Sequence, residues 1–372
     1  MKTSIQRPYA ITMWDFSWLE RRYPGAGYED WDVALGELVE RGYDAVRIDA
    51  YPHLVSAGPH REWEILPIWT QLDWGAPALT RVRILPELLE FLAAARRHNV
   101  KVGLSTWYRQ DRDNLRLNIK TPIDQAQIWI DTLKHIAAAD LMDCVLFVDF
   151  CNEFPIAKWT PYLYGGETGE EIRRTSVKLT EWMRQSVRLV KDVYPDLDYT
   201  YSFCTQFDDW ADQDVSMLDF LEPHVWMAHR STSDYYKNIG GYTHQGFSPD
   251  GINLIVANGY DEYMCNKDHY DGKLLAEVDN MAEWSRASGK PLITTECWAL
   301  VDYKDWPLLD WGWIKDLCEL GLTQAAGSGR WVGMATSNFC GPQFVGMWQD
   351  VEWHKRLTDM IKTSNIDSDL KS

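Results

Sequence analysis

The feature that most constrains the fold is a repeated alternation of short apolar runs with amphipathic helical patterns, which occurs about eight times along the chain. The runs are rich in Val, Ile, Leu and aromatic residues, and several are apolar on both faces, as strands covered by helices on both sides are. They span residues 9–16, 45–50, 100–107, 145–153, 199–204, 223–229, 291–297 and 330–336. This pattern predicts an α/β protein in which each strand is followed by a helix.

The segments between the runs carry helical spacing of apolar residues. They include residues 29–41, 86–98, 121–141, 170–194, 271–288 and 351–363. Gly42 is a plausible cap after the first segment, and Thr121-Pro122 gives the third a cap residue and a first-turn proline. Eight such units predict a single (β/α)8 TIM barrel over residues 1–363, followed by a frayed polar tail at 364–372. A doubly wound open sheet is the competing fold, but no GxGxxG or GxxxxGK[ST] motif follows any strand.

Long insertions follow three of the predicted strands, at residues 51–80, 230–270 and 337–349. Each lies on the face where barrel enzymes carry their active sites. The insertions are dense in aromatic residues: Trp63, Trp69, Trp74, Tyr235, Tyr236, Tyr242, Tyr260, Tyr263 and Trp348. The whole chain holds 20 Trp and 18 Tyr, which suits a cleft where aromatic rings stack on sugars as well as a large core. Loops of this length favour a closed pocket and exo action, whereas an endo-acting enzyme would use them to line an open cleft.

The net charge of the chain limits the classes of molecule that it is expected to bind. The chain has 37 Lys and Arg against 55 Asp and Glu, a formal net charge of −18, which disfavours nucleic acid and anionic membranes. A neutral carbohydrate is the easier substrate. The seven cysteines are scattered without a CxxC pair, so neither a disulfide framework nor a structural zinc site is predicted. With no apolar signal segment at the start, a cytoplasmic protein is expected, as a monomer or homodimer.

Two glutamates mark the predicted chemistry. Asn152-Glu153 ends the fourth predicted strand and Thr295-Glu296 ends the seventh. Carboxylates at the ends of opposed barrel strands can face each other across the central pocket. Double displacement at an anomeric carbon needs such a pair about 5–5.5 Å apart.

This arrangement resembles the cellulase-like (β/α)8 group, clan A of the retaining glycoside hydrolases. The resemblance implies that Glu153 is the general acid/base, that Glu296 is the nucleophile and that Asn152 binds the sugar 2-hydroxyl. Residues 42–48 (GYDAVRI) resemble the strand-two segment of the group, which implies that Arg47 supports the nucleophile. No cofactor is implied. An acid catalyst keeps its proton near neutral pH, so we expect a raised pKa at Glu153.

Other strand ends depart from the family pattern, so the identity of the sugar that is bound is not predicted. Asp49 stands where proline usually follows, and the third strand ends at Trp107 rather than with a histidine. The eighth strand end offers no tryptophan, and the sixth carries Trp226 and His229. Besides Asn152 and Arg47, the expected substrate-binding residues are Asp49, His229, Trp107 and Trp298.

Three alternatives stay open at this stage. Oxygen and imidazole ligands at strand ends could hold a divalent ion in a metal-dependent sugar isomerase or epimerase. The candidate ligands are Asp149, Glu153, His224, His229 and Glu296. The second alternative is a sugar-binding barrel without catalysis, and the third is transfer of the glycosyl group to an acceptor sugar. A purely structural role is a further possibility for each carboxylate and for Arg47, which could neutralise Asp49 or Asp15.

Overall fold

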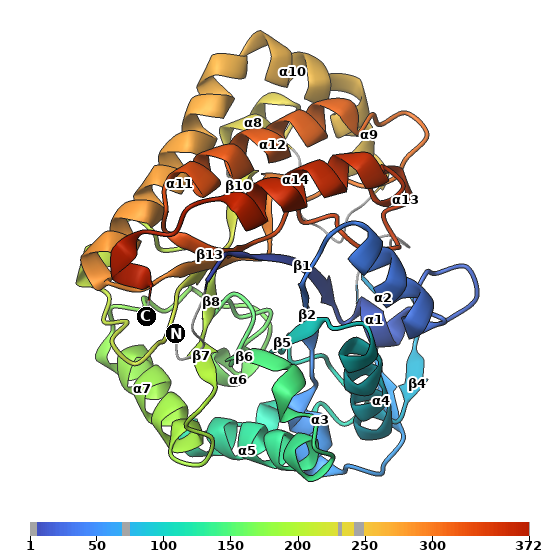
Figure 1. The fold of residues 1–372 in the computed structure, drawn as a ribbon, viewed down its shortest axis with the longest axis vertical. Helices are drawn as coiled ribbons and strands as arrows, with labels where there is room; N and C mark the ends of the chain where they lie inside the picture. The colour runs from blue at the N-terminus through green and yellow to red at the C-terminus, as the bar shows by residue number, and fades with distance from the viewer. Residues whose placement is uncertain (1–5, 69–74, 230–232, 242–248, 372) are drawn as a thin grey trace.

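The computed structural model describes residues 6–68, 75–229, 233–241 and 249–371. Seven parallel strands form one curved sheet in the order β11-β13-β1-β2-β5-β6-β7 (Figure 1). Their bounds are Tyr9–Asp15 (β1), Ala45–Asp49 (β2), Lys101–Ser105 (β5), Val145–Asp149 (β6), Asp198–Thr200 (β7), Leu292–Thr294 (β11) and Trp331–Met334 (β13). From β1 through β2, β5 and β6 to β7, the strand order in the sheet is the order of the predicted runs along the chain. Between β7 and β11, the barrel is completed by short ladders.

Short parallel ladders close this sheet into a barrel. β8 (Ser202–Phe203) continues β7 and pairs with β9 (Glu222–Pro223). β10 (Val225–Ala228) then pairs with β12 (Cys297–Leu300), which continues β11, and a parallel bridge joins Leu221 to Leu292. The fifth, sixth and seventh strands are therefore each broken in two. The predicted (β/α)8 barrel is confirmed.

Helices surround the barrel (Figure 1). Those that follow strands are α2 (Trp31–Glu40), α4 (Ile84–Arg97), α5 (Pro122–Ala138), α7 (Val177–Lys191), α11 (Lys267–Ser288), α12 (Gly312–Gly327) and α14 (Val351–Thr363). α5 begins as predicted, because the Thr121 side chain accepts from the Asp124 N–H and the Asp124 carboxylate accepts from the Thr121 N–H. α7 begins later than predicted, at the Ser176 cap.

The connections after two strands differ from the sequence prediction. A helix was expected after the seventh strand, but no residues were assigned to it, because the three glycines of α12 weaken the helical pattern; one of them, Gly321, lets the helix approach Trp298 closely. Conversely, residues 204–221 connect β8 to β9 with only a 3₁₀ turn, η3 (Trp210–Asp212). The expectation that a helix follows every strand was wrong there.

The insertions carry small elements of their own. They are α3 (Pro52–Ala57), β3 (Trp63–Ile65), β4 (Thr80–Val82), α8 (Asp234–Asn238), α9 (Pro249–Leu254), η4 (Ile255–Gly259), α10 (Tyr260–Cys265) and α13 (Val345–Trp348). The predicted Trp69, Trp74 and Tyr242 lie outside the described residues. Of the described insertion aromatics, Trp63, Tyr235, Tyr236, Tyr263 and Trp348 are buried and only Tyr260 is exposed. Most of these aromatic side chains therefore pack in the interior of the insertions.

The amino-terminal end of the barrel is filled and sealed. An apolar cluster there includes Ile11, Phe147, Phe220 and Ile293 together with Ile366 from the segment predicted to be a frayed tail. That prediction was wrong: Ile366 is 4% exposed, and the neighbouring Asp367 and Asp369 pair with Arg330. A ligand can therefore approach the centre of the barrel from the carboxyl ends of the strands.

Short segments complete the fold: α1 (Ser17–Glu20), α6 (Pro161–Tyr164), η1 (Leu115–Asn118), η2 (Met142–Cys144) and η5 (Ser368–Leu370). Within the described part of the chain, no helix has both the length and the apolar character that a membrane crossing requires.

Candidate active site

A buried arginine connects the strand ends at the centre of the barrel. Arg47 on β2 is fully buried, and its Nη1 donates to Glu296 Oε1 at 3.0 Å. Its Nη2 donates to Asp149 Oδ2 at 2.6 Å and to Asn152 Oδ1 at 2.7 Å. Hydroxyls accept from the same guanidinium: those of Ser105, Thr295 and Ser202. Arg47 therefore fixes the ends of β2, β6 and β11 relative to one another.

Glu153 lies beyond the end of its strand. β6 stops at Asp149, so the predicted strand at 145–153 was too long, and Glu153 adopts a left-handed backbone conformation with φ of 49°. This conformation is costly for a glutamate and is held by its surroundings. The Glu153 N–H donates to Ser202 Oγ at 2.9 Å, and Trp159 Nε1 donates to Glu153 Oε2 at 3.0 Å. The turn thereby directs the carboxylate toward the Glu296 side of the site.

Glu153 and Glu296 face each other with a histidine between them. One carboxylate oxygen of each glutamate and one His224 ring nitrogen all lie within 4.8 Å of one another. His224 Nδ1 is 3.2 Å from Glu153 Oε1 and 3.7 Å from Glu296 Oε2. His224 and Glu296 are buried, and the Glu153 side chain is 12% exposed.

The histidine decides how protons are distributed over this pair. Burial disfavours the charged form of His224, but the carboxylates of Glu296 and Glu222 outweigh it and raise the pKa of His224 to about 10. Burial also opposes charge on Glu153, yet the hydrogen bond from His224 lowers the pKa of Glu153 to about 2. Burial raises the pKa of Glu296 to about 7, with the charge of His224 opposing this and that of Glu153 adding to it. The expectation of a raised pKa at Glu153 was therefore wrong.

Several predicted substrate-binding residues lie at this centre. Asn152 receives its hydrogen bond from Arg47 through Oδ1, which leaves its amide nitrogen as the remaining donor group. Trp107 lies against the Arg47 guanidinium at 4.7 Å from the ring centre. His229 Nε2 is 4.0 Å from Glu153 Oε1, and its ring stacks on Trp226.

Two other predicted binding residues do not serve that role. Both carboxylate oxygens of the buried Asp49 accept backbone N–H groups, from Tyr51 at 2.7 Å and from Trp107 at 3.0 Å, so Asp49 positions the strand ends. Trp298 is fully buried, packs against α12 at Gly321 and donates to the Ala335 carbonyl. It lies between barrel and helices, so its assignment to substrate binding was wrong.

Other site residues were missed or undervalued in the sequence. Glu222 lies 3.7 Å from Arg47 Nε and 3.4 Å from His224 Nε2; a carboxylate at the start of an apolar run was the available signal. His224 was considered only as a metal ligand. Trp159 lies in a loop whose sequence gives no indication of its contact with Glu153.

Among the residues that the structure describes, two groups of side chains could accept a metal ion. They are Glu153 with His224 and Glu296, and Glu153 with Cys204 and His229. Asp149, proposed as a ligand from the sequence, belongs to neither group because Arg47 occupies its carboxylate. The metal-ligand set predicted from the sequence is thus brought together only in part.

The family assignment agrees with this geometry. The model of the family described as "Cellulase-like: Sugar-binding cellulase-like" matches residues 11–362. The chain belongs to this sugar-binding cellulase-like family. The resemblance inferred from the strand-end residues is therefore confirmed. Among curated proteins, none matches the chain.

Solved structures place this cellulase-like chain among glycoside hydrolase barrels. A candidate glycoside hydrolase from Parabacteroides distasonis ATCC 8503 is 47% identical, with a TM-score of 0.93 over 98% of this chain and 96% of the other. The endo-β-1,4-mannanase of Thermotoga petrophila shares the fold at 11% identity, with a TM-score of 0.54 over 98% and 78%. GH5_18 from Streptomyces cattleya, solved with GlcNAc, also shares it, at 11% identity and a TM-score of 0.54 over 97% and 82%.

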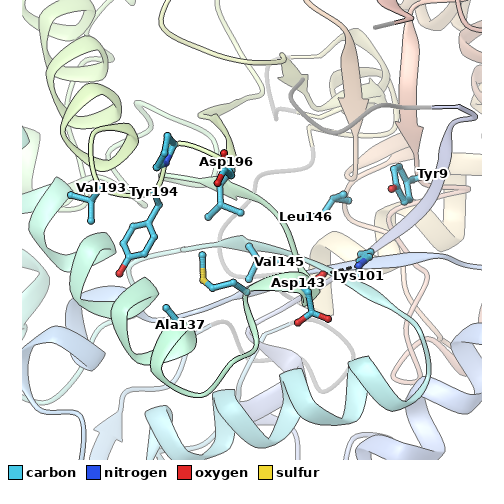
Figure 2. A pocket seen from close by; sticks show the side chains of 12 residues that line it. Tyr9, Lys101, Ala137, Asp143, Val145, Leu146, Val193, Tyr194 and Asp196 are labelled. Atoms are coloured by element: carbon cyan, nitrogen blue, oxygen red, sulfur yellow. Dashed lines mark hydrogen bonds between the residues drawn. The ribbon is translucent and has the colours of Figure 1, made fainter.

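Cavities lie at both ends of the cellulase-like barrel. One of about 450 Å³ is lined by residues that include Cys204, Gln206 and His229, and it adjoins Glu153, since ligand atoms of Cys204 and His229 lie within 4.8 Å of the Glu153 carboxylate. Another, of about 560 Å³, lies at the amino ends of β5 and β6 (Figure 2). Its lining includes Lys101, whose Nζ donates to the Asp143 carbonyl. Because the glutamate pair lies at the opposite ends of the strands, only the first cavity can serve the proposed chemistry.

Proposed function

We propose that the protein is a retaining glycosidase that cleaves a β-linked glycoside or short oligosaccharide by double displacement. The observation that carries this proposal is the approach of Glu153 and Glu296, whose carboxylate oxygens lie within 4.8 Å. Retaining enzymes hold their carboxyl groups about 5–5.5 Å apart, whereas inverting enzymes need about 6.5–9.5 Å to admit a water. The hydrogen bond from Arg47 to Glu296 supports the assignment of Glu296 as the nucleophile.

In the first step, a Glu296 oxygen attacks the anomeric carbon and the bond to the leaving oxygen breaks. Glu153 donates its proton to that oxygen, which departs as an alcohol. In the second step, Glu153 takes a proton from water as the water attacks the anomeric carbon and releases Glu296. Two displacements restore the original anomeric configuration. Asn152, fixed by Arg47, donates to the sugar 2-hydroxyl.

The first step requires a particular proton arrangement. With pKa values of about 7 for Glu296 and about 2 for Glu153, the proton lies on Glu296 rather than on Glu153. Moving this proton to Glu153 leaves the net charge of the pair unchanged, and His224 lies within 3.7 Å of both carboxylates. We infer that a sugar hydroxyl and the exclusion of water favour the reactive arrangement, in which Arg47 stabilises ionised Glu296.

We also propose exo action in the cytoplasm. The insertions after the second, sixth and eighth strands fold into elements at the open end of the barrel, which supports a pocket for one chain end. All seven cysteines are free thiols, which supports a reducing compartment. A monomer or homodimer stays a prediction, as does hydrolysis rather than glycosyl transfer.

The decisive experiment uses aryl β-glycosides, with the matched α-anomers as controls, and two variants. Glu296→Gly should be inactive until azide is added, and should then form a glycosyl azide of inverted configuration. Glu153→Gly should retain activity on activated aryl substrates, and azide should yield a product of retained configuration. Inverted configuration from Glu153→Gly and retained configuration from Glu296→Gly would reverse the assigned roles.

A sugar-binding barrel without catalysis is the second candidate, since the matching family is described as sugar-binding. Binding of a sugar detected by calorimetry, without turnover of any glycoside by the wild type, would favour that function. The paired glutamates, with Trp159 and Arg47 holding one each, support catalysis instead.

A further inference from the structure

The acid/base candidate Glu153 also belongs to a second cluster, which it forms with Cys204 and His229. Cys204 follows β8 and His229 follows β10. One ligand atom each from Glu153, Cys204 and His229 lie within 4.8 Å of one another, and the His229 Nε2 to Glu153 Oε1 distance is 4.0 Å. Three separate strand ends thus bring a carboxylate, a thiol and an imidazole together.

This combination is the chemistry of a zinc site. Zn²⁺ binds thiolate, imidazole and carboxylate in tetrahedral geometry, and its bond lengths place such ligand atoms about 3.4–3.6 Å apart. The observed separations exceed these values by little more than about 1 Å, which side-chain rotation can close. The two groups differ in their ligand atoms: this cluster contains a thiol sulfur, whereas the Glu153–His224–Glu296 group offers only nitrogen and oxygen atoms.

The cluster also has an entry path. Cys204 and His229 line the cavity of about 450 Å³, together with Glu171 and Arg173. The Arg173 guanidinium pairs with carboxylates of residues 208 and 209, so its charge is offset, while Glu171 adds a carboxylate to the cavity wall. Such a cavity has room for a hydrated cation and for a water as the fourth ligand.

We propose that Glu153, Cys204 and His229 bind a thiophilic divalent cation, Zn²⁺, and that the bound ion blocks Glu153 as the acid/base. The blocking part rests on the proposed glycosidase function. A carboxylate coordinated to Zn²⁺ cannot deliver a proton to a leaving oxygen, so the occupied enzyme is reversibly inhibited and a chelator restores it.

Binding is tested with Co²⁺ alone, because a thiolate bound to Co²⁺ gives a charge-transfer absorption in the near ultraviolet. The wild type should show this band at one Co²⁺ per chain, and Zn²⁺ should displace it. Cys204→Ser should abolish the band, and His229→Gln should weaken Co²⁺ binding at least ~100-fold. Cys265→Ser is the matched control, because Cys265 is exposed on the surface, and it should leave the band unchanged. No band, or a band that survives in Cys204→Ser, would overturn the site.

Inhibition is tested separately, with each variant compared with its own metal-free activity. Zn²⁺ should inhibit the wild type and Cys265→Ser alike, and half-inhibition of His229→Gln should need at least ~100-fold more Zn²⁺. Equal inhibition of all variants would refute blocking through this site. If the Co²⁺ band forms but no glycoside is turned over, the proposed function fails and the metal site stands. If a glycoside is turned over but no Co²⁺ band forms, the metal site fails and the proposed function stands.

Discussion

Replacement of Arg47 by methionine should destabilise the protein in a pH-dependent way. The guanidinium is fully buried and lies 2.6 Å from Asp149, 3.0 Å from Glu296 and 3.7 Å from Glu222. Breaking a buried ion pair from one side costs about 3–5 kcal/mol, because the remaining charge is left without compensation. With an unfolding entropy of about 2.1 cal/mol/K per residue, the 372 residues convert this cost into a fall in Tm of about 4–6 °C.

The pH dependence has a definite sign. Without Arg47, the pKa values of the buried carboxylates rise above those of the unfolded chain, so the penalty is fully present at neutral pH and decreases as acid protonates them. The fall in Tm should therefore be at least halved between pH 7.5 and pH 5, as measured by calorimetry. The control is Arg7→Met, since Arg7 makes an exposed pair with Asp44; it should change Tm by less than about 1 °C. A loss below 1 °C for Arg47→Met, or one that grows in acid, would refute the reasoning.

Three further predictions concern catalysis and acid stability. Because the proposed first step needs one proton on the glutamate pair, and this proton is lost from Glu296 with a pKa of about 7, kcat/KM should fall as the pH rises through about 7; a kcat/KM that rises with pH through this range would contradict the assignment. Asn152→Ala should lower kcat/KM about 10–100-fold on a glycoside with a 2-hydroxyl, through loss of one hydrogen bond to charge-developing substrate, yet change it less than ~3-fold on the 2-deoxy analogue. Burial lowers the pKa of His354 to about 3, so stability should decline below pH 6.5, by up to about 1.4 kcal/mol per pH unit; urea unfolding of His354→Gln should show a shallower decline, and an unchanged slope would exclude this residue as the cause.

Much of the barrel could be predicted because each strand is encoded locally. A short run apolar on both faces identifies β2 or β5 without knowledge of its neighbours, and the order of parallel strands in a barrel follows the chain. The residues of α12 could not be assigned from the sequence, because glycines within the segment disfavour a helix. The reason for Gly321 is the close packing of α12 on Trp298, which the sequence does not show. The connection over residues 204–221 is the opposite case: a helix was expected there from the strand–helix alternation, but the barrel closes without it.

The identity of the site residues could be predicted better than their protonation. Arg47 lies on β2, and Asn152, Glu153 and Glu296 lie just beyond strand ends, where the strand order of a parallel barrel brings them together. The position of His224 depends on the interruption between β9 and β10, which no periodicity reveals. Because that histidine approaches Glu153 more closely than Glu296, it reverses the expected order of the two carboxylate pKa values.

The charges of the whole centre suit the proposed reaction better than either glutamate alone. Three buried carboxylates, those of Asp149, Glu222 and Glu296, and the partly exposed carboxylate of Glu153 surround two cations, Arg47 and protonated His224. One proton shared by the glutamate pair leaves a net charge of about −1 in a site shielded from water. Positive charge that develops on an oxocarbenium-like sugar therefore enters a negative field already in place, and no reorganisation is needed at that moment. The same field would attract a divalent cation to Glu153, so the proposed glycoside hydrolysis and the proposed sensitivity to Zn²⁺ have a common physical origin.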